Sequence, residues 1–79
     1  MTRQEAFQKI HEERKRQDHL HPEWHGHQHG LVVLAEEFGE VAKALYEYHQ
    51  DPTADRYEEL KEELVQVAAV CVRWLEHLE

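Results

Sequence analysis

Two segments of this chain repeat apolar residues at alternating spacings of three and four, the pattern of helices that pack lengthwise against other helices. The first segment, residues 30–48, places Leu31, Leu34, Phe38, Val41, Leu45 and Tyr48 in one row. The second, residues 55–78, places Tyr57, Leu60, Leu64, Val67, Cys71, Trp74 and Leu78 in another. We therefore expect two long helices, each with one apolar seam.

A shorter helix is expected over residues 2–17, because Thr2 and Glu5 have the spacing of a capping box. Asp51 as N-cap, followed by Pro52 as the first helical residue, is the expected start of the last helix. The connection before that helix is short, which favours an antiparallel pair of long helices.

A second apolar stripe runs beside the seam of each long helix, so a lone helical hairpin cannot bury both. A chain of 79 residues makes one domain, residues 1–79. A core of this size rarely supplies more than about 3–5 kcal/mol unaided. We therefore predict an all-α fold, a bundle of about three helices per chain that is completed by homo-oligomerisation.

Composition excludes several classes of partner. The net charge of −8 argues against binding a nucleic-acid backbone, which needs clustered Lys and Arg. The longest run free of both charged residues and histidine, residues 64–72, is too short to span a bilayer, so no membrane partner is expected. The N-terminus is amphipathic and charged, unlike a signal peptide, and the single Cys71 excludes an intrachain disulfide. These features predict a cytoplasmic protein.

An acidic motif occurs in both long helices. LAEEFGEV at residues 34–41 matches LKEELVQV at residues 60–67, so that Glu37 and Glu40 correspond to Glu63 and Gln66. In an antiparallel hairpin turning near residue 51, Glu37 is level with Gln66 and Glu40 with Glu63. Three acids so close repel each other unless a cation lies between them. The pattern predicts a site for Mg²⁺, with Mn²⁺ as the alternative.

These motifs carry a family resemblance. EExxE on one helix, followed on the next by ExxD, is the signature of the all-α nucleotide pyrophosphohydrolases, which include MazG and the dimeric dUTPases. EEFGE at 36–40 matches the first half, and ELVQ at 63–66 matches the second except that Gln66 replaces Asp. The chain resembles small MazG-like members over most of its length.

The resemblance implies a Mg²⁺-dependent nucleoside triphosphate pyrophosphohydrolase, which converts an NTP or dNTP into a monophosphate and pyrophosphate. It implies a homodimer or homotetramer with a house-cleaning or nucleotide-pool role. The metal ligands would be Glu37, Glu40, Glu63 and Gln66. Glu36 and Glu37 are the candidate catalytic residues. By its angular position Glu36 is either an ordinary surface charge or a group that orients or deprotonates a water.

Five further side chains are candidate substrate ligands, namely Arg14, Gln17, Trp24, His29 and Lys43. The first two, together with Arg16, end the first helix and can reach phosphates, or they are a solvated helix terminus. The tryptophan can stack on a base or cap the core. His29 stands at the entrance of the second helix, near the expected substrate. The lysine can contact a phosphate or pair with Glu47.

The segment HLHPEWHGHQHG, residues 19–30, holds five of the eight histidines. Alternating histidines can chelate transition metals, but a glycine-containing loop gives them no fixed geometry. We expect a flexible lid over the metal patch. Two other functions remain open, a non-catalytic nucleotide-binding or regulatory protein, and a helical interaction module with a His-rich transition-metal loop.

Overall fold

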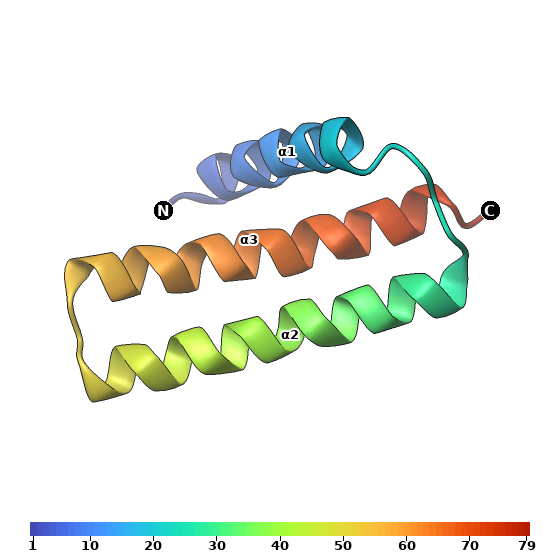
Figure 1. The fold of residues 1–79 in the computed structure, drawn as a ribbon. Helices are drawn as coiled ribbons and strands as arrows, with labels where there is room; N and C mark the ends of the chain where they lie inside the picture. Colours follow the sequence, from blue (N-terminus) through green and yellow to red (C-terminus); the bar gives the residue numbers. More distant parts are fainter.

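The structure, a computed structural model, describes all residues from 1 to 79 and contains three α-helices and no strand. Helix α1 spans Arg3–Leu20, α2 spans His27–Gln50 and α3 spans Ala54–Glu76 (Figure 1). The predicted all-α fold with three helices is confirmed. No helix is both long and apolar enough to cross a membrane.

The helix ends follow local side-chain chemistry. The capping box of α1 is confirmed, because Thr2 Oγ1 accepts the Glu5 N–H at 3.1 Å and a Glu5 carboxylate oxygen accepts the Thr2 N–H at 3.4 Å. The expected start of α3 is wrong. Thr53 is its N-cap, and Asp51 instead ends α2. The residue before a proline is driven out of the helical conformation, so Asp51 terminates the preceding helix.

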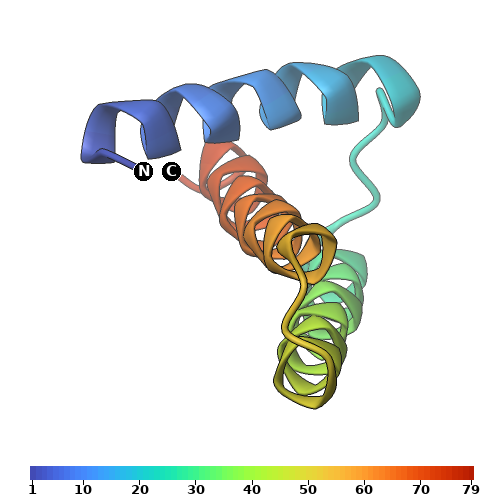
Figure 2. The same cartoon turned by 90° about the vertical axis from the view of Figure 1, so that its left-hand side faces the viewer.

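The three helices form a stack rather than a triangular bundle. Helices α2 and α3 lie antiparallel and side by side, while α1 crosses α3 on the side away from α2 (Figures 1 and 2). Helix α1 packs on α3 and makes no packing contact with α2. Arg14 fastens this crossing, since its buried guanidinium bonds Glu76 of α3 at 2.6 Å and Asp18 at 2.8 Å.

The core of the single chain is very small. Its only buried apolar residues are Ala44, Ala69 and Val70, and no large side chain is fully buried. Within the single chain only half of each predicted row is covered. Alternate members of each row are exposed, including Leu31, Phe38 and Leu45 in α2 and Leu64 and Cys71 in α3.

The actual contact strip between α2 and α3 is rotated relative to the predicted rows. It runs through Gly30, Glu37 and Ala44 on α2 and through Glu63 and Val70 on α3, all buried or half-buried. Two helices touch along one narrow strip. The residue that directly follows each member of the strip lies about 100° further round its helix, and there it has no neighbour in the chain. One consequence is that two acidic side chains lie within the helix contact itself.

Candidate active site

The acidic residues of the two motifs meet at the centre of the α2–α3 contact. Gln66 lies between Glu37 of α2 and Glu63 of α3, in agreement with the predicted register. We assign its amide nitrogen to the side facing both carboxylates, where it donates to Glu37 Oε2 at 3.1 Å and to Glu63 Oε2 at 3.2 Å. One neutral side chain thus bridges two acids on different helices.

Both bridged carboxylates hold their protons more tightly than usual. The pKa of Glu37 is raised by burial and then by the charges of Glu40, Glu13 and Glu36, while Arg16 opposes the rise. The pKa of Glu63 is raised by burial and then by the charges of Glu37 and Glu40. Burial together with mutual repulsion marks a place where a bound cation would relieve unfavourable charge.

Three of the four predicted metal ligands are within hydrogen-bond contact, and the fourth is not. Glu40 is exposed beside the cluster, where its charge acts on both bridged acids. No three acidic, histidine or cysteine side chains come close enough to form a metal-holding group. Gln66 occupies the space between Glu37 and Glu63. The oxygen donors otherwise suit a hard cation such as Mg²⁺.

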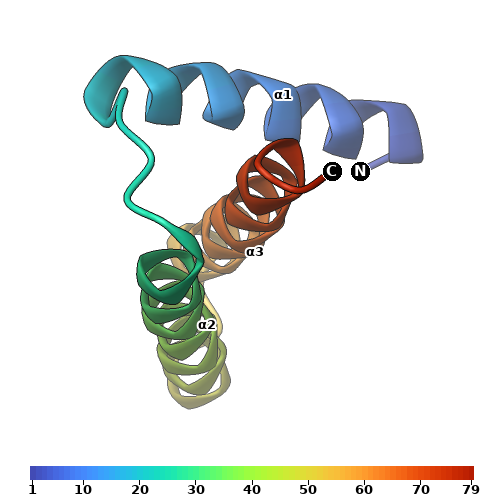
Figure 3. The same cartoon turned by 90° about the vertical axis from the view of Figure 1, so that its right-hand side faces the viewer.

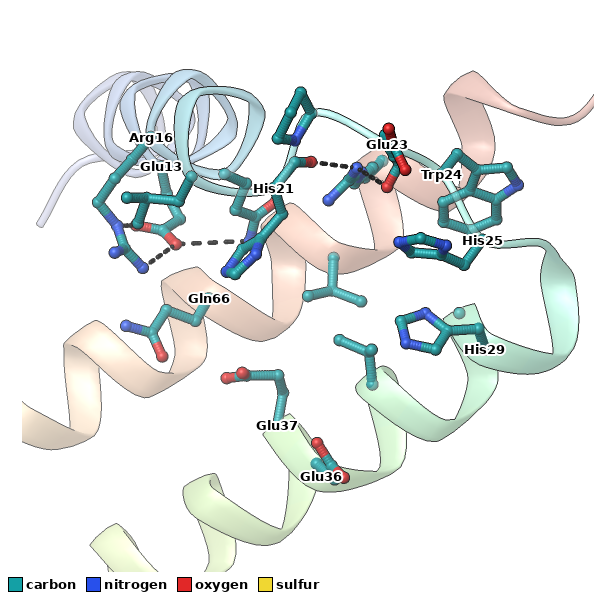
Figure 4. Close-up of a pocket in the computed structure, with 17 residues that line it drawn as sticks. Glu13, Arg16, His21, Glu23, Trp24, His25, His29, Glu36, Glu37 and Gln66 are labelled. Carbon is teal, nitrogen blue, oxygen red and sulfur yellow. Dashed lines mark hydrogen bonds and ion pairs between the residues drawn. The ribbon is translucent and has the colours of Figure 1, made fainter.

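A cavity of about 620 Å³ adjoins the cluster. It is enclosed by the end of α1, the connecting loop and one side of the α2–α3 pair, and it exists because α1 does not contact α2. Glu36, Glu37 and Gln66 line one part of it, while His25 and His29 line another (Figure 4). Pockets of this volume are large enough for a small organic ligand.

Helix α1 adds Glu13 and Arg16 to the site. The sequence had offered Arg16 as a residue that can reach phosphates, whereas Glu13 was not among the candidates. Both Arg16 Nε and an Arg16 terminal nitrogen donate to the Glu13 carboxylate at 2.8 Å, and the pair lines the cavity. This ion pair raises the pKa of Arg16. In the sequence the two residues resemble an ordinary surface pair three positions apart. Only the crossing of α1 over α3 turns them toward Glu37.

The candidate substrate ligands divide into two groups. Gln17, Trp24 and His29 line the cavity. Arg14 and Lys43 do not line it. The guanidinium of Arg14 is engaged by acidic side chains and holds α1 on α3, whereas Lys43 is exposed on α2.

The connecting loop is fastened to the end of α3. A terminal nitrogen of Arg73 donates to the backbone oxygens of His21 and Glu23, at 2.6 and 3.0 Å. Trp74 Nε1 donates to His27 Nδ1 at 3.0 Å, at the start of α2. These contacts give the loop a defined conformation, which the expectation of a flexible lid did not include.

Trp24 completes this attachment. Its ring stacks on His77, with centroids 4.4 Å apart and planes 3° from parallel. Its edge lies against Gly30, where a β-carbon would come within 2.7 Å of the ring. One face of the indole is therefore already covered, and a base stacking there would have to displace His77.

The histidines of the loop are dispersed among different partners. The rings of His25 and His29 meet edge to face, with centroids 5.1 Å apart, whereas His27 accepts the tryptophan N–H. They do not form a group of three metal ligands, either among themselves or with nearby acids and the cysteine.

No protein-family model, curated protein or solved structure matches this chain. The resemblance to the MazG-like proteins therefore stays a prediction from the motifs. Any function must be argued from the residues of this chain and their geometry.

Proposed function

We propose that this chain is a nucleoside triphosphate pyrophosphohydrolase that depends on Mg²⁺ or Mn²⁺. The observation that carries the proposal is the pairing of Glu37 and Glu63 across the helix contact, beside a cavity and with the pKa of both acids raised. Acids are rarely put inside a helix contact unless their charge has a use.

The residues that would hold the cation are Glu37, Glu63 and Gln66, with Glu40 joining from the exposed edge. The amide of Gln66 presents its nitrogen to the two acids, and a half-turn of the same group would present its oxygen to a cation. When bound, Mg²⁺ supplies charge neutralisation for the phosphates.

The cavity supplies the substrate side. Arg16 is its candidate phosphate ligand, because its guanidinium is exposed and is held toward the cavity by Glu13. Gln17, Trp24 and His29 provide further polar and aromatic surface. A nucleotide in this cavity would lie between the Arg16 guanidinium and the acidic cluster. This arrangement suits a phosphate group that is bound together with a divalent cation.

The proposed reaction is the hydrolysis of a phosphoanhydride bond. A water oxygen bonds to the α-phosphorus, and the bond from that phosphorus to the α–β bridging oxygen breaks. The products are a nucleoside monophosphate and pyrophosphate. Glu36 lines the cavity with an exposed carboxylate and takes the proton from the attacking water. We propose that the protein works as a homodimer or homotetramer, with no nucleic-acid or membrane partner.

The test is pyrophosphate release from a panel of canonical and modified nucleoside and deoxynucleoside triphosphates, with Mg²⁺, with Mn²⁺ and with EDTA. We expect metal-dependent release that Glu63→Gln and Glu40→Ala abolish or strongly reduce. Glu58→Gln is the matched control, because Glu58 is an exposed acid of the same helix that pairs with Lys61 away from the cluster. Absence of release across the panel, or release that is equal in Glu63→Gln and Glu58→Gln, would contradict the proposal.

A non-catalytic nucleotide-binding protein is the second candidate, and the Gln66 bridge is the observation that favours it. A neutral residue at this position weakens cation binding relative to an acid. This function predicts nucleotide binding without turnover in calorimetry, and Gln66→Asp would then gain pyrophosphate release. Wild-type turnover would reject it.

A further inference from the structure

The ion pair between Glu13 and Arg16 brings two residues of α1 together at the wall of the cavity. Arg16 Nε donates to one oxygen of the Glu13 carboxylate and an Arg16 terminal nitrogen donates to the other, both at 2.8 Å (Figure 4). The side chain of Glu13 is 11% exposed, whereas that of Arg16 is 55% exposed. The carboxylate is therefore largely enclosed, while the guanidinium stays open to a ligand in the cavity.

Glu13 is held in this position from its other side. Gln17 Nε2 donates to Glu13 Oε2 at 3.4 Å, and the Oε1 of this buried glutamine accepts from Arg14 at 3.2 Å. Arg14 is fixed in turn by Asp18 and Glu76. Because an arginine can only donate, Arg14 makes the amide of Gln17 turn its nitrogen toward Glu13. Glu13 is thus a fixed negative charge rather than a mobile surface acid.

This fixed charge adds to an excess of acids around the cavity. The lining is net negative while its histidines are neutral, because it contains two arginines and four acids, namely Glu13, Glu23, Glu36 and Glu37. Arg73 is committed to two backbone oxygens of the connecting loop, which runs from the end of α1 to the start of α2 (Figure 3). Arg16 is the other arginine, and Glu13 occupies two of its nitrogens. An anion in this cavity must therefore displace Glu13 or lie beside its charge.

The charge of Glu13 also acts on the acidic cluster. Burial raises the pKa of Glu37 most, and the charges of Glu40 and Glu13 raise it further. Figure 4 shows the Glu13–Arg16 pair on the same side of the cavity as Gln66 and Glu37. A divalent cation at the cluster would offset the charge of Glu13 together with that of Glu37. One carboxylate therefore couples cation binding at the cluster to anion binding at Arg16.

We propose that Glu13 is a specificity-determining residue, which makes the cavity exclude metal-free polyphosphates and accept polyphosphates that carry a divalent cation. A metal-free polyphosphate brings only negative charge to a lining that is already negative. A polyphosphate complexed with Mg²⁺ brings positive charge as well, which offsets the acids that its phosphate groups approach. The selectivity comes from repulsion of the wrong ligand rather than from added attraction for the right one.

The inference rests on the proposed function in one respect, that Arg16 is a phosphate ligand. The experiment is isothermal titration calorimetry with inorganic tripolyphosphate, in EDTA and in excess Mg²⁺. The variant is Glu13→Gln, which keeps the size of the side chain and an oxygen that can accept from Arg16 but removes the charge. In EDTA it is expected to bind tripolyphosphate about 10-fold or more tightly than the wild type does. In Mg²⁺ the two proteins should differ by less than about 3-fold.

Two further variants separate the charge of Glu13 from its structural role. Glu12→Gln is the matched control, because Glu12 is exposed on the same helix, lies outside the cavity and makes one side-chain bond, to Gln8 at 3.3 Å. It removes the same charge and should leave both affinities within about 2-fold of the wild type. Glu13→Asp keeps the charge and should retain the weak binding in EDTA, although it changes the length of the side chain.

Binding and turnover are measured separately, so the inference and the proposed function can fail separately. Selective binding without pyrophosphate release would reject the hydrolase and leave the role of Glu13 intact. Equal binding of metal-free tripolyphosphate by Glu13→Gln and Glu12→Gln, equal tightening in EDTA and in Mg²⁺, or no binding to any of these proteins would each overturn the inference.

Discussion

Replacing Gln66 with leucine removes the donor that bridges Glu37 and Glu63, and should destabilise the metal-free protein. A hydrogen bond to a charged group contributes about 1.5–3 kcal/mol when buried. Both acids are half-buried, so water replaces part of each bond, and we expect a combined loss of about 2 kcal/mol. For a chain of this size, that corresponds to a fall in melting temperature of about 8–16 °C.

Gln66→Asp extends the test to the cation. The new carboxylate gives no hydrogen bond and adds a third charge to two acids whose pKa is already raised. In EDTA at neutral pH this variant should be less stable than Gln66→Leu. Mg²⁺ should reverse the order, because the added charge strengthens cation binding.

The assay is urea unfolding followed by circular dichroism, at one protein concentration, in EDTA and in Mg²⁺. Gln8→Leu is the matched control, because Gln8 is exposed on α1 and makes one side-chain bond, to Glu12 at 3.3 Å. Its unfolding free energy should change by less than about 0.5 kcal/mol. If Gln66→Leu is as stable as Gln8→Leu, the bridge contributes nothing. If Gln66→Asp gains no more from Mg²⁺ than the wild type does, the cluster does not bind the ion.

Three further predictions concern the surroundings of the cluster. Gly30→Ala places a methyl group 2.7 Å from the Trp24 ring and should cost about 1–3 kcal/mol, with a change in tryptophan fluorescence; an unchanged spectrum would contradict the packing. Arg14→Ala should cost about 2 kcal/mol in urea unfolding by loosening α1 from α3, and should raise the KM of any nucleotide hydrolysed, because α1 carries Arg16 and Gln17 into the cavity; an unchanged free energy of unfolding would contradict this role of Arg14. The raised pKa of Glu37 means that its ionisation opposes folding, so stability in EDTA should rise as pH falls through that pKa toward the ordinary value of 4.5. Urea titrations should show a smaller rise in Glu37→Gln; an equal rise would reject this assignment.

The sequence determined the helices and their register. A period near 3.6 residues places side chains on defined faces regardless of what surrounds them. The capping box at Thr2 follows from the same local geometry, as does the level pairing of Glu37 with Gln66. The N-cap of α3 is Thr53 rather than Asp51. Both residues have N-cap chemistry, so local sequence does not decide between them.

The candidate site was only partly predictable. The doubled motif identified Glu37, Glu63 and Gln66, because two helices joined by a short turn leave little freedom of register. Glu13 and Arg16 could not be found in this way, since their position depends on how α1 crosses α3. The same is true of Arg14, whose partner Glu76 lies 62 residues further along the chain.

Only the tertiary structure decided which half of each apolar row is buried. The spacing of three and four marks every member of a row as apolar, but two helices can cover no more than one strip of each other. In this chain that strip includes Glu37 and Glu63 and leaves Phe38 and Leu64 outside. The spacing of apolar residues is set within one helix. Which of these residues are buried depends on the helices that pack against it, and the sequence of one helix does not specify that packing.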